Sequence, residues 1–275
     1  MRIDAHHHFW RYNAEDYSWI DSSMHWLRRD FLPADLQDAI AEVGIDGVVS
    51  VQARQTLEET TWLLALAESS SSVCGVVGWV PLCDQDVKST LERLQSSENL
   101  VGVRHVVQDE PDDEFLLRED FNAGVALLHE FDLAYDILVF ERHLPTTLEF
   151  VDRHPQQRFV LDHMAKPRIA ENDLEPWATN LNALARRQNV YCKVSGMVTE
   201  ADRDRWTQEQ LLPYWETVLD AFGPRRMMFG SDWPVCLLAS EYQKWYQCVQ
   251  DFAGQLSVSE QNMLFGGTAT LAYNL

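Results

Sequence analysis

The sequence is poor in basic residues and contains no long apolar run. Its 22 lysines and arginines stand against 43 aspartates and glutamates, which gives a formal net charge of -21 at pH 7. Such a charge repels nucleic acids and anionic membrane surfaces, so neither is expected as a partner. No window of about 18 uncharged apolar residues is present, and the chain opens directly on a strand pattern. We therefore expect a soluble protein without a secretory signal.

Cysteine is scarce, and none of it occurs as a CxxC pair. The residues are odd in number and far apart in the sequence: Cys74, Cys83, Cys192, Cys236 and Cys248. This spacing argues against a disulfide framework and against a thiolate zinc site. The simplest location for such a protein is a reducing compartment, and we expect it to be cytoplasmic.

The sequence also lacks a Gly/Ser-rich or Pro-rich linker, and apolar strands alternate with amphipathic helices along its whole length. The strands are expected at residues 3–9, 47–54, 74–81, 100–107, 133–139, 158–165, 190–196 and 227–230. Eight strand-then-helix units in 275 residues predict a (β/α)₈ TIM barrel, with residues 1–275 forming one domain. A doubly wound open sheet is the alternative, but no GxGxxG opens its first crossover.

Helix boundaries in this pattern have recognisable signals. Thr56 with Glu59, and Thr207 with Gln210, have the spacing of a capping box at a helix start. Gly44 follows an apolar stripe of helical period and predicts the end of the first helix.

The first strand ends in three adjacent histidines. Alternation along a strand predicts Asp4, His6 and His8 on one face and the intervening residues on the other. Two imidazoles on one face can hold a metal ion or polarise an oxygen anion. A remnant of an expression tag is a poor explanation, because three histidines are few and lie inside a strand pattern. An ordinary buried histidine cluster is an equally good reading of these three residues alone.

Polar residues at the ends of the predicted strands are the site candidates, because the active sites of TIM barrels lie at the C-terminal ends of their strands. This criterion selects His6, His8, Arg54, Arg104, His105, His163 and Asp232. The barrel would gather these distant residues at one mouth.

Three motifs together resemble the amidohydrolase superfamily: the HxH pair within residues 4–10, Asp162-His163, and the Gly-Ser-Asp-Trp-Pro run at residues 230–234. The similarity is closest to the amidohydrolase-2 branch and its sugar lactonases, similar to L-fuconolactonase and L-rhamnonolactonase, and it covers essentially the whole chain. The resemblance implies a hydrolase that opens a small sugar-derived lactone to its aldonic acid.

The resemblance also implies roles for particular residues. His6 and His8 correspond to the metal-ligand pair of the first strand, His163 to the histidine of the sixth strand, and Asp232 to the aspartate of the eighth strand, a general base and proton shuttle. A carboxylate beside histidines or a metal stays ionised near neutral pH, which suits proton transfer. Structural alternatives are a turn residue before Pro234 for Asp232 and a hydrogen-bonded core residue for His163.

The metal content implied by the resemblance is at most one ion. Members with two metals use further ligands on strands four and five, where this chain has Arg104-His105 and Tyr135-Asp136. One divalent ion, preferably zinc, could bind His6, His8, His163 and Asp232. Catalysis without a metal, with histidines and arginines polarising the carbonyl, is the other interpretation.

Binding residues are expected around this centre. Arg54, Arg104 and His105 could donate hydrogen bonds to a polyhydroxylated lactone, or could pair with acidic residues of the chain. Trp26 and Trp233 could form an apolar wall for the sugar ring, although tryptophan is more often a core residue. Trp79 is a third candidate for this wall.

Two other functions are compatible with the same residues. A metal-dependent decarboxylase of the same branch would act on an anionic aromatic acid with the same histidines and aspartate. A non-catalytic binding protein on a barrel fold would show scattered rather than convergent polar residues. The identity of the sugar, the lactone ring size and assembly into a homo-oligomer are not determined by the sequence.

Overall fold

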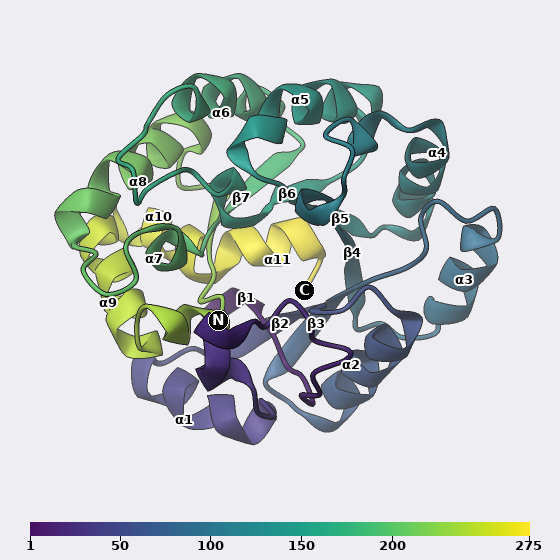
Figure 1. Cartoon of the computed structure of the whole chain (residues 1–275), viewed down its shortest axis with the longest axis horizontal. Helices are drawn as coiled ribbons and strands as arrows, with labels where there is room; N and C mark the ends of the chain where they lie inside the picture. Colours follow the sequence, from purple (N-terminus) through teal and green to yellow (C-terminus); the bar gives the residue numbers. More distant parts are fainter.

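The computed structural model describes residues 1–275 and contains one sheet of eight parallel strands that follow chain order (Figure 1). The strands are β1 (Ile3–His7), β2 (Gly47–Val51), β3 (Val73–Gly78), β4 (Leu100–Val106), β5 (Ala134–Leu138), β6 (Phe159–Leu161), β7 (Val190–Val194) and β8 (Met227–Phe229). The chain after β8 returns to β1, where the backbone N–H of Asp232 donates to the carbonyl of His6 at 2.8 Å. The sheet is thus a nearly closed barrel, which confirms the predicted TIM barrel and excludes the open sheet.

Helices follow the strands, and most of them form an outer ring around the barrel (Figure 1). They are α1 (Pro33–Val43), α2 (Leu57–Ser69), α3 (Val87–Leu94), α4 (Glu119–Leu128), α5 (Leu144–Arg153), α6 (Trp177–Ala185), α7 (Met197–Glu200), α8 (Gln208–Phe222), α9 (Tyr242–Phe252), α10 (Val258–Asn262) and α11 (Thr268–Tyr273). Thr56 and Thr207 accept hydrogen bonds from the backbone N–H groups of Glu59 and Gln210, which confirms them as N-caps, but the reciprocal contact of a capping box is not formed at either helix. No helix combines the length and the apolar character needed to cross a membrane.

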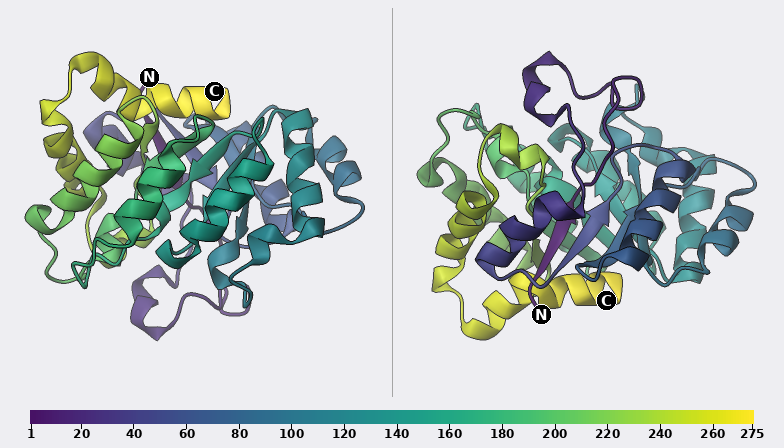
Figure 2. Two further views of the ribbon diagram at one scale, coloured as in Figure 1. Left: turned by 90° about the horizontal axis from the view of Figure 1, so that it is seen from above. Right: turned by 90° about the horizontal axis from the view of Figure 1, so that it is seen from below.

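The apolar core has two layers. The larger one lies between the strands and the outer helices, as expected when amphipathic helices cover a parallel sheet. The smaller one fills the barrel interior and includes Ala5 of β1, Val160 of β6, and Ala272 of α11. Helix α11 lies across the end of the barrel where the strands begin (Figure 2). That end is closed by packing, so a cavity can form only at the opposite end.

A β-bulge in β1 changes which residues face the barrel interior. The pairing of β1 with β2 shifts register between Asp4 and His7. Ala5 packs inside the barrel, whereas Asp4 accepts a hydrogen bond from Tyr242 of the outer helix α9 at 3.0 Å. The prediction that Asp4 shares a face with His6 and His8 is therefore wrong, because the bulge inserts a residue and reverses the alternation.

A long segment between β1 and α1, residues 11–30, projects beyond the mouth of the barrel on the side opposite α11 (Figure 2). We call it the mouth loop. It is held down through Tyr17, whose hydroxyl donates to the buried carboxyl group of Glu59 at 3.2 Å. It is also held through Asp16, which pairs with Arg54 at 2.8 Å. The mouth loop therefore forms one wall of the space above the barrel.

Candidate active site

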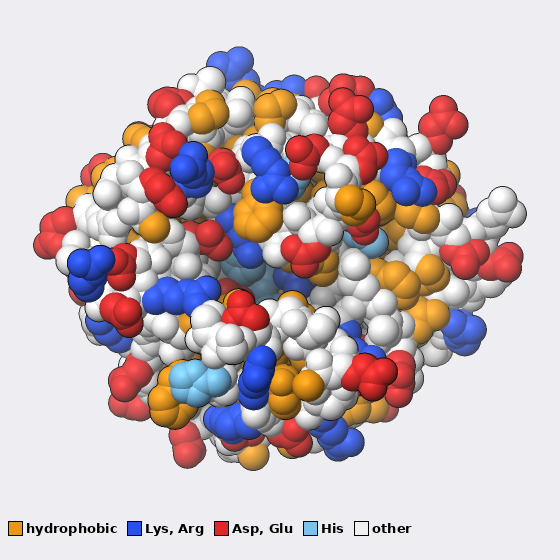
Figure 3. Space-filling view, viewed as in Figure 1, with side chains coloured by type: hydrophobic (Ala, Val, Ile, Leu, Met, Phe, Trp, Pro, Cys, Tyr) orange, Lys and Arg blue, Asp and Glu red, His pale blue; other side chains and the backbone are white.

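A cavity of about 700 Å³ opens at the C-terminal ends of the strands. Figure 3 shows it as a hollow at the centre of this face, with lysine, arginine and histidine side chains in its depth. Its polar lining comes from many elements and includes Asp16, Arg54, Gln55, Arg104, Gln108, Asp109, His8, His163, Lys166, Thr199, Glu200, Arg203 and Asp232. The lining of this cavity therefore combines carboxylates with cationic and imidazole groups, in a molecule whose net charge is -21.

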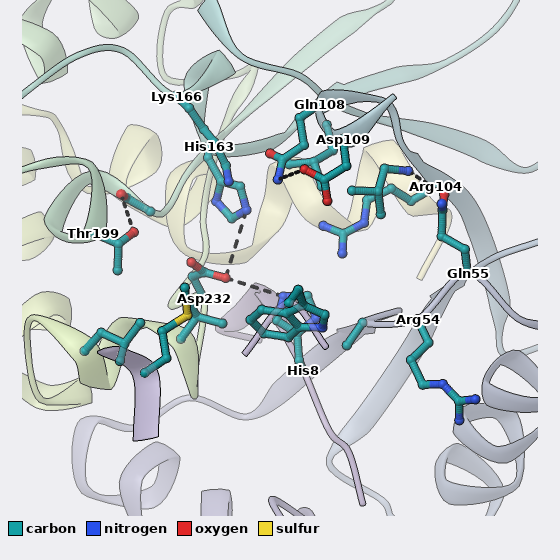
Figure 4. A pocket seen from close by; sticks show the side chains of 18 of the residues that line it. His8, Arg54, Gln55, Arg104, Gln108, Asp109, His163, Lys166, Thr199 and Asp232 are labelled. Atoms are coloured by element: carbon teal, nitrogen blue, oxygen red, sulfur yellow. Dashed lines mark hydrogen bonds and ion pairs between the residues drawn. The ribbon is translucent and has the colours of Figure 1, made fainter. Parts of the chain in front are cut away.

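Four predicted residues meet at the base of this cavity. Nε2 of His6 lies 3.2 Å from Nε2 of His8. The carboxylate Oδ1 of Asp232 lies 3.4 Å from Nε2 of His8 and 4.0 Å from Nε2 of His163 (Figure 4). The same oxygen lies 3.8 Å from Nε2 of His6. The convergence is the opposite of the scattered arrangement expected of a binding protein without an active site.

An unusual backbone segment places His163 at this point. Residues His163, Met164, Ala165 and Lys166 all have positive φ angles, between 48° and 61°. The left-handed region costs a non-glycine residue roughly 1–2 kcal/mol. The turn is held by hydrogen bonds, including one from Trp177 Nε1 to the carbonyl of Met164 at 2.7 Å. Strain of this kind persists where the surrounding structure enforces it and is concentrated at functional sites.

The ring of His163 is fixed from behind by β7 and the residues after it. Its Nδ1 lies 2.8 Å from Oγ of Ser195. Gly196 packs against the ring so closely that a Cβ there would lie 2.8 Å from Nδ1. Burial lowers the pKa of His163 to about 4, against the smaller opposing effect of Asp232. The ring is therefore neutral near pH 7 and turns Nε2 toward Asp232.

Asp232 is buried but ionised. Burial by itself raises the pKa of this carboxyl group, but interactions with His163 and His8 outweigh it and leave the pKa below its ordinary value. The residue has a φ of 58°. Its backbone conformation and its hydrogen bond to His6 aim the carboxylate at the histidines. An ionised carboxylate in this place can accept a proton from water.

The chemistry of this donor set fits one divalent ion. Two ligand atoms bound about 2.0–2.2 Å from one zinc ion at the tetrahedral angle lie about 3.3–3.6 Å apart. The distances among His6, His8 and Asp232 are 3.2, 3.4 and 3.8 Å. His163 lies at the edge of the same group. Nitrogen and oxygen ligands of this kind are the ones zinc prefers.

Beneath the histidines lies a network of buried charges that the sequence patterns did not reveal. Lys193 of β7 contacts Asp136 of β5 at 2.5 Å and Asp162 at 3.0 Å. Asp162 also pairs with Nη1 of Arg104 at 2.9 Å. Burial raises the pKa of Asp136 to about 6, against the opposing effect of Lys193. For Asp162, burial is outweighed by Lys193 and His6, and its pKa lies well below the ordinary value.

Arg104 and Arg54 both line the cavity as expected, but their hydrogen bonds are largely made within the chain. Arg104 is bound to Asp162 and to the carbonyl of Gln52. Arg54 is bound to Asp16 of the mouth loop. Both arginines therefore pair with acidic residues of the chain, which is the alternative interpretation of these residues. Both also line the cavity.

His105 and the three predicted tryptophans, Trp26, Trp79 and Trp233, do not line the cavity, which corrects these predictions. His105 follows Arg104 on β4 and so points to the opposite side of the strand, where Nε2 contacts Glu110 at 2.6 Å and the ring stacks on Phe115. Trp233 is buried against Phe31 as a core residue.

The other two tryptophans also lie elsewhere. Trp26 is on the outer surface of the mouth loop and is 72% exposed. Trp79 donates from Nε1 to His105 at 3.4 Å, on the outer side of the barrel. Trp19 of the mouth loop is the tryptophan that borders the cavity.

Several lining residues were missed by reasoning from the sequence. Lys166 extends into the cavity with its ammonium group 3.9 Å from a carboxylate oxygen of Glu200. Thr199, Glu200 and Arg203 follow the end of β7 and form the wall beside Lys166. Lys166 comes three residues after His163. A polar residue just after a predicted strand end is a signal that could have identified it as a lining residue.

Comparison with known proteins agrees with this fold. The amidohydrolase family matches residues 3–275. An L-fucono-1,5-lactonase of Burkholderia multivorans is 43% identical, with 100% of this chain and 96% of that protein covered. An L-fucono-1,5-lactonase of Burkholderia ambifaria is 38% identical at the same coverage. A crystal structure of an amidohydrolase from Burkholderia multivorans with bound zinc is 42% identical, covers 100% of this chain and 99% of its own, and superimposes with a TM-score of 0.97. The chain belongs to the amidohydrolase family.

Proposed function

We propose that this protein hydrolyses a small sugar-derived lactone, such as L-fucono-1,5-lactone, to the corresponding aldonic acid. The observation that carries the proposal is the ionised Asp232 facing three histidines at the base of a polar cavity. The two relatives named L-fucono-1,5-lactonase support the substrate class, since the whole of this chain aligns with each of them.

The residues at the base of the cavity suit ester hydrolysis. Asp232 accepts a proton from the attacking water, whose oxygen forms a bond to the lactone carbonyl carbon. Hydrogen-bond donors among His6, His8 and His163 stabilise the negative charge that develops on the carbonyl oxygen. When the bond from the carbonyl carbon to the ring oxygen breaks, Asp232 returns the proton to that ring oxygen. The product is the open hydroxy acid, and the carboxylate is regenerated.

The upper part of the cavity suits a ring with several hydroxyl groups. Lys166 and Arg203 offer cationic donors, and Glu200 offers an acceptor. Burial raises the pKa of Glu200, while the adjacent Lys166 acts against that rise. Donors and acceptors on one wall can distinguish the orientation of hydroxyl groups, because an unmatched polar group in a buried site is costly. We assign stereochemical selection to these residues together with Gln55.

His6, His8 and Asp232, with His163 beside them, would hold one divalent ion, and zinc fits their chemistry best. Such an ion, when bound, would supply Lewis-acid polarisation of the carbonyl oxygen. Asp232 would remain the only carboxylate at the base of the cavity able to accept the proton of water.

A screen of sugar lactones with a pH indicator tests the proposal. Acid release from an L-fuconate or L-rhamnonate lactone, with and without a chelator, is the expected result. The matched control is Asp232→Asn, which retains the cavity and lacks the base. No acid release from any sugar lactone, together with release of carbon dioxide from an aromatic acid, would instead establish the decarboxylase.

A further inference from the structure

One part of the cavity lining is apolar and is not used by the proposed catalytic steps. It contains Met24, Val235 and Leu238, and each of them is only partly buried against the hydrophobic core. Met24 lies in the helical turn Ser22–Leu27 of the mouth loop, and the other two lie in the helical turn Val235–Leu238 that follows β8. The two turns pack against each other. We call these three residues the apolar corner.

The backbone places the apolar corner next to the proposed base. The N–H of Cys236 donates to the carbonyl of Asp232 at 2.9 Å, so the segment between them folds into one turn. Val235 belongs to this turn, and both Val235 and Asp232 line the cavity. The two residues therefore lie at the same end of the cavity and face the same part of a bound substrate.

The other apolar residues of the lining are dispersed among polar ones. Ala53, Val106 and Leu138 come from the ends of three different strands, β2, β4 and β5. Gln55 lies beside Val106, because its Oε1 accepts a hydrogen bond from the backbone N–H of Val106 at 2.8 Å. The side chains of the apolar corner donate no hydrogen bond, so a hydroxyl group buried among them would lose its water without compensation. The corner therefore favours a hydrocarbon group.

The chemistry of ring opening brings one particular carbon of the substrate to this place. In the proposed reaction Asp232 returns a proton to the ring oxygen, so that oxygen lies within hydrogen-bonding distance of the carboxylate. In a 1,5-lactone the ring oxygen is bonded to carbon 5, and the substituent of carbon 5 therefore lies beside Asp232. In L-fucono-1,5-lactone this substituent is a methyl group, which has no polar atom.

We propose that Met24, Val235 and Leu238 form a subsite for the methyl group on the carbon next to the ring oxygen, and that this subsite selects 6-deoxyaldono-1,5-lactones. The proposal rests on the proposed lactonase function for the orientation of the ring. Loss of a carbon group from an apolar pocket lowers kcat/KM by roughly 10- to 200-fold, and an added hydroxyl group lowers it by up to about 100-fold.

The subsite also distinguishes the two ring sizes of a lactone. In the 1,4-lactone of the same acid, the carbon next to the ring oxygen carries a two-carbon group with a hydroxyl group. This group is larger than methyl, and its hydroxyl group finds no donor or carboxylate among Met24, Val235 and Leu238. Burial of an unpaired hydroxyl group is unfavourable, so the 1,5-lactone is the better fit.

Three 1,5-lactones that differ only at carbon 5 test the subsite in the wild-type protein. L-fucono-1,5-lactone carries a methyl group there, L-galactono-1,5-lactone a hydroxymethyl group and D-arabinono-1,5-lactone a hydrogen atom. We expect kcat/KM for the methyl lactone to exceed that for each of the other two by about 10- to 100-fold. Equal values for the three lactones would overturn the subsite and leave the proposed function standing.

Val235→Thr tests the residues, because it replaces one methyl group of the apolar corner by a hydroxyl group of similar size. The ratio of kcat/KM for the methyl lactone to that for the hydroxymethyl lactone should fall at least about fivefold, since the new hydroxyl group pairs with that of the substrate. Val106→Thr is the matched control on β4, which lies opposite β8 in the barrel, and should keep the wild-type ratio. A folded Val235→Thr protein with the wild-type ratio would refute the assignment. If this variant does not fold, the three lactones still decide the proposal.

Binding of ring ethers gives a measurement that does not depend on hydrolysis. 1,5-anhydro-L-fucitol and 1,5-anhydro-D-arabinitol have the rings of the methyl and hydrogen lactones and lack the carbonyl group. In titration calorimetry the fucitol should bind roughly fivefold more tightly, because one more carbon group is buried. This preference without hydrolysis of any sugar lactone would refute the proposed function alone, whereas equal affinities would overturn the subsite.

Discussion

Replacing Asp232 by asparagine is the most direct test of the proton-transfer chemistry. Asparagine has nearly the same shape and tolerates the left-handed region better than most residues, which matters because φ is 58° at this position. The backbone hydrogen bond from this residue to His6 does not involve the side chain and remains. The variant should therefore fold with a thermal midpoint close to that of the wild-type protein.

The effect on catalysis should be large, because asparagine cannot accept the proton of water. Removal of a general base costs about 10²–10⁴-fold in rate. At 1.36 kcal/mol for each factor of ten, this is roughly 3–5 kcal/mol of transition-state stabilisation. The loss should appear in kcat, because His6, His8 and His163 still bind the carbonyl group.

The assay is continuous acid release from L-fucono-1,5-lactone between pH 5 and 7, where spontaneous hydrolysis can be subtracted. The neighbours of Asp232 lower its pKa below the ordinary value, so the wild-type rate should not decline across this range as pH falls. Asp232→Ala should show the same catalytic loss and an additional loss of stability, because alanine at positive φ is strained by roughly 1 kcal/mol. A folded Asp232→Asn protein with more than a tenth of wild-type kcat would refute the assignment of the base.

Three further predictions concern the surroundings of the site. Burial raises the pKa of Glu59 from 4.5 to about 7, so the folded protein binds a proton that the unfolded chain releases, and stability falls as pH rises through this range. Urea unfolding at pH 5 and pH 8 should show Glu59→Gln gaining about 2.5 kcal/mol relative to wild type over the interval, and an equal difference at both pH values would contradict it. Gly196→Ala should displace the His163 ring and reduce kcat/KM roughly 10- to 100-fold, whereas Gly44→Ala, with a similar φ of 71° and open space around it, should lose stability only. Chelation should lower the rate of lactone hydrolysis, and added zinc should restore it, if one ion held by His6, His8 and Asp232 polarises the carbonyl; a rate unchanged within about twofold would assign that polarisation to the histidines alone.

The sequence by itself determined the barrel and the identity of the central residues. Alternating strand and helix patterns are local properties, so eight units could be recognised from hydrophobic period and capping signals such as Thr56 and Thr207. The rule that barrel strands end at one mouth then selected His6, His8, His163 and Asp232. That these four residues lie close together could therefore be predicted without any interatomic distance.

The tertiary structure alone decided which way individual side chains point and what they contact. A bulge in β1 places Asp4 on the opposite face of the strand from His6 and His8, and no local sequence pattern in that strand predicts the bulge. His105 lies outside the barrel because neighbouring strand residues alternate, so only one of Arg104 and His105 can face the cavity. Lys193 and His6 are in contact although they are 187 positions apart in the sequence. The contact forms only because closure of the barrel brings the side chains of β7 and β1 together. Side-chain protonation and orientation are set by such long-range contacts, which a pattern of local periodicity does not contain.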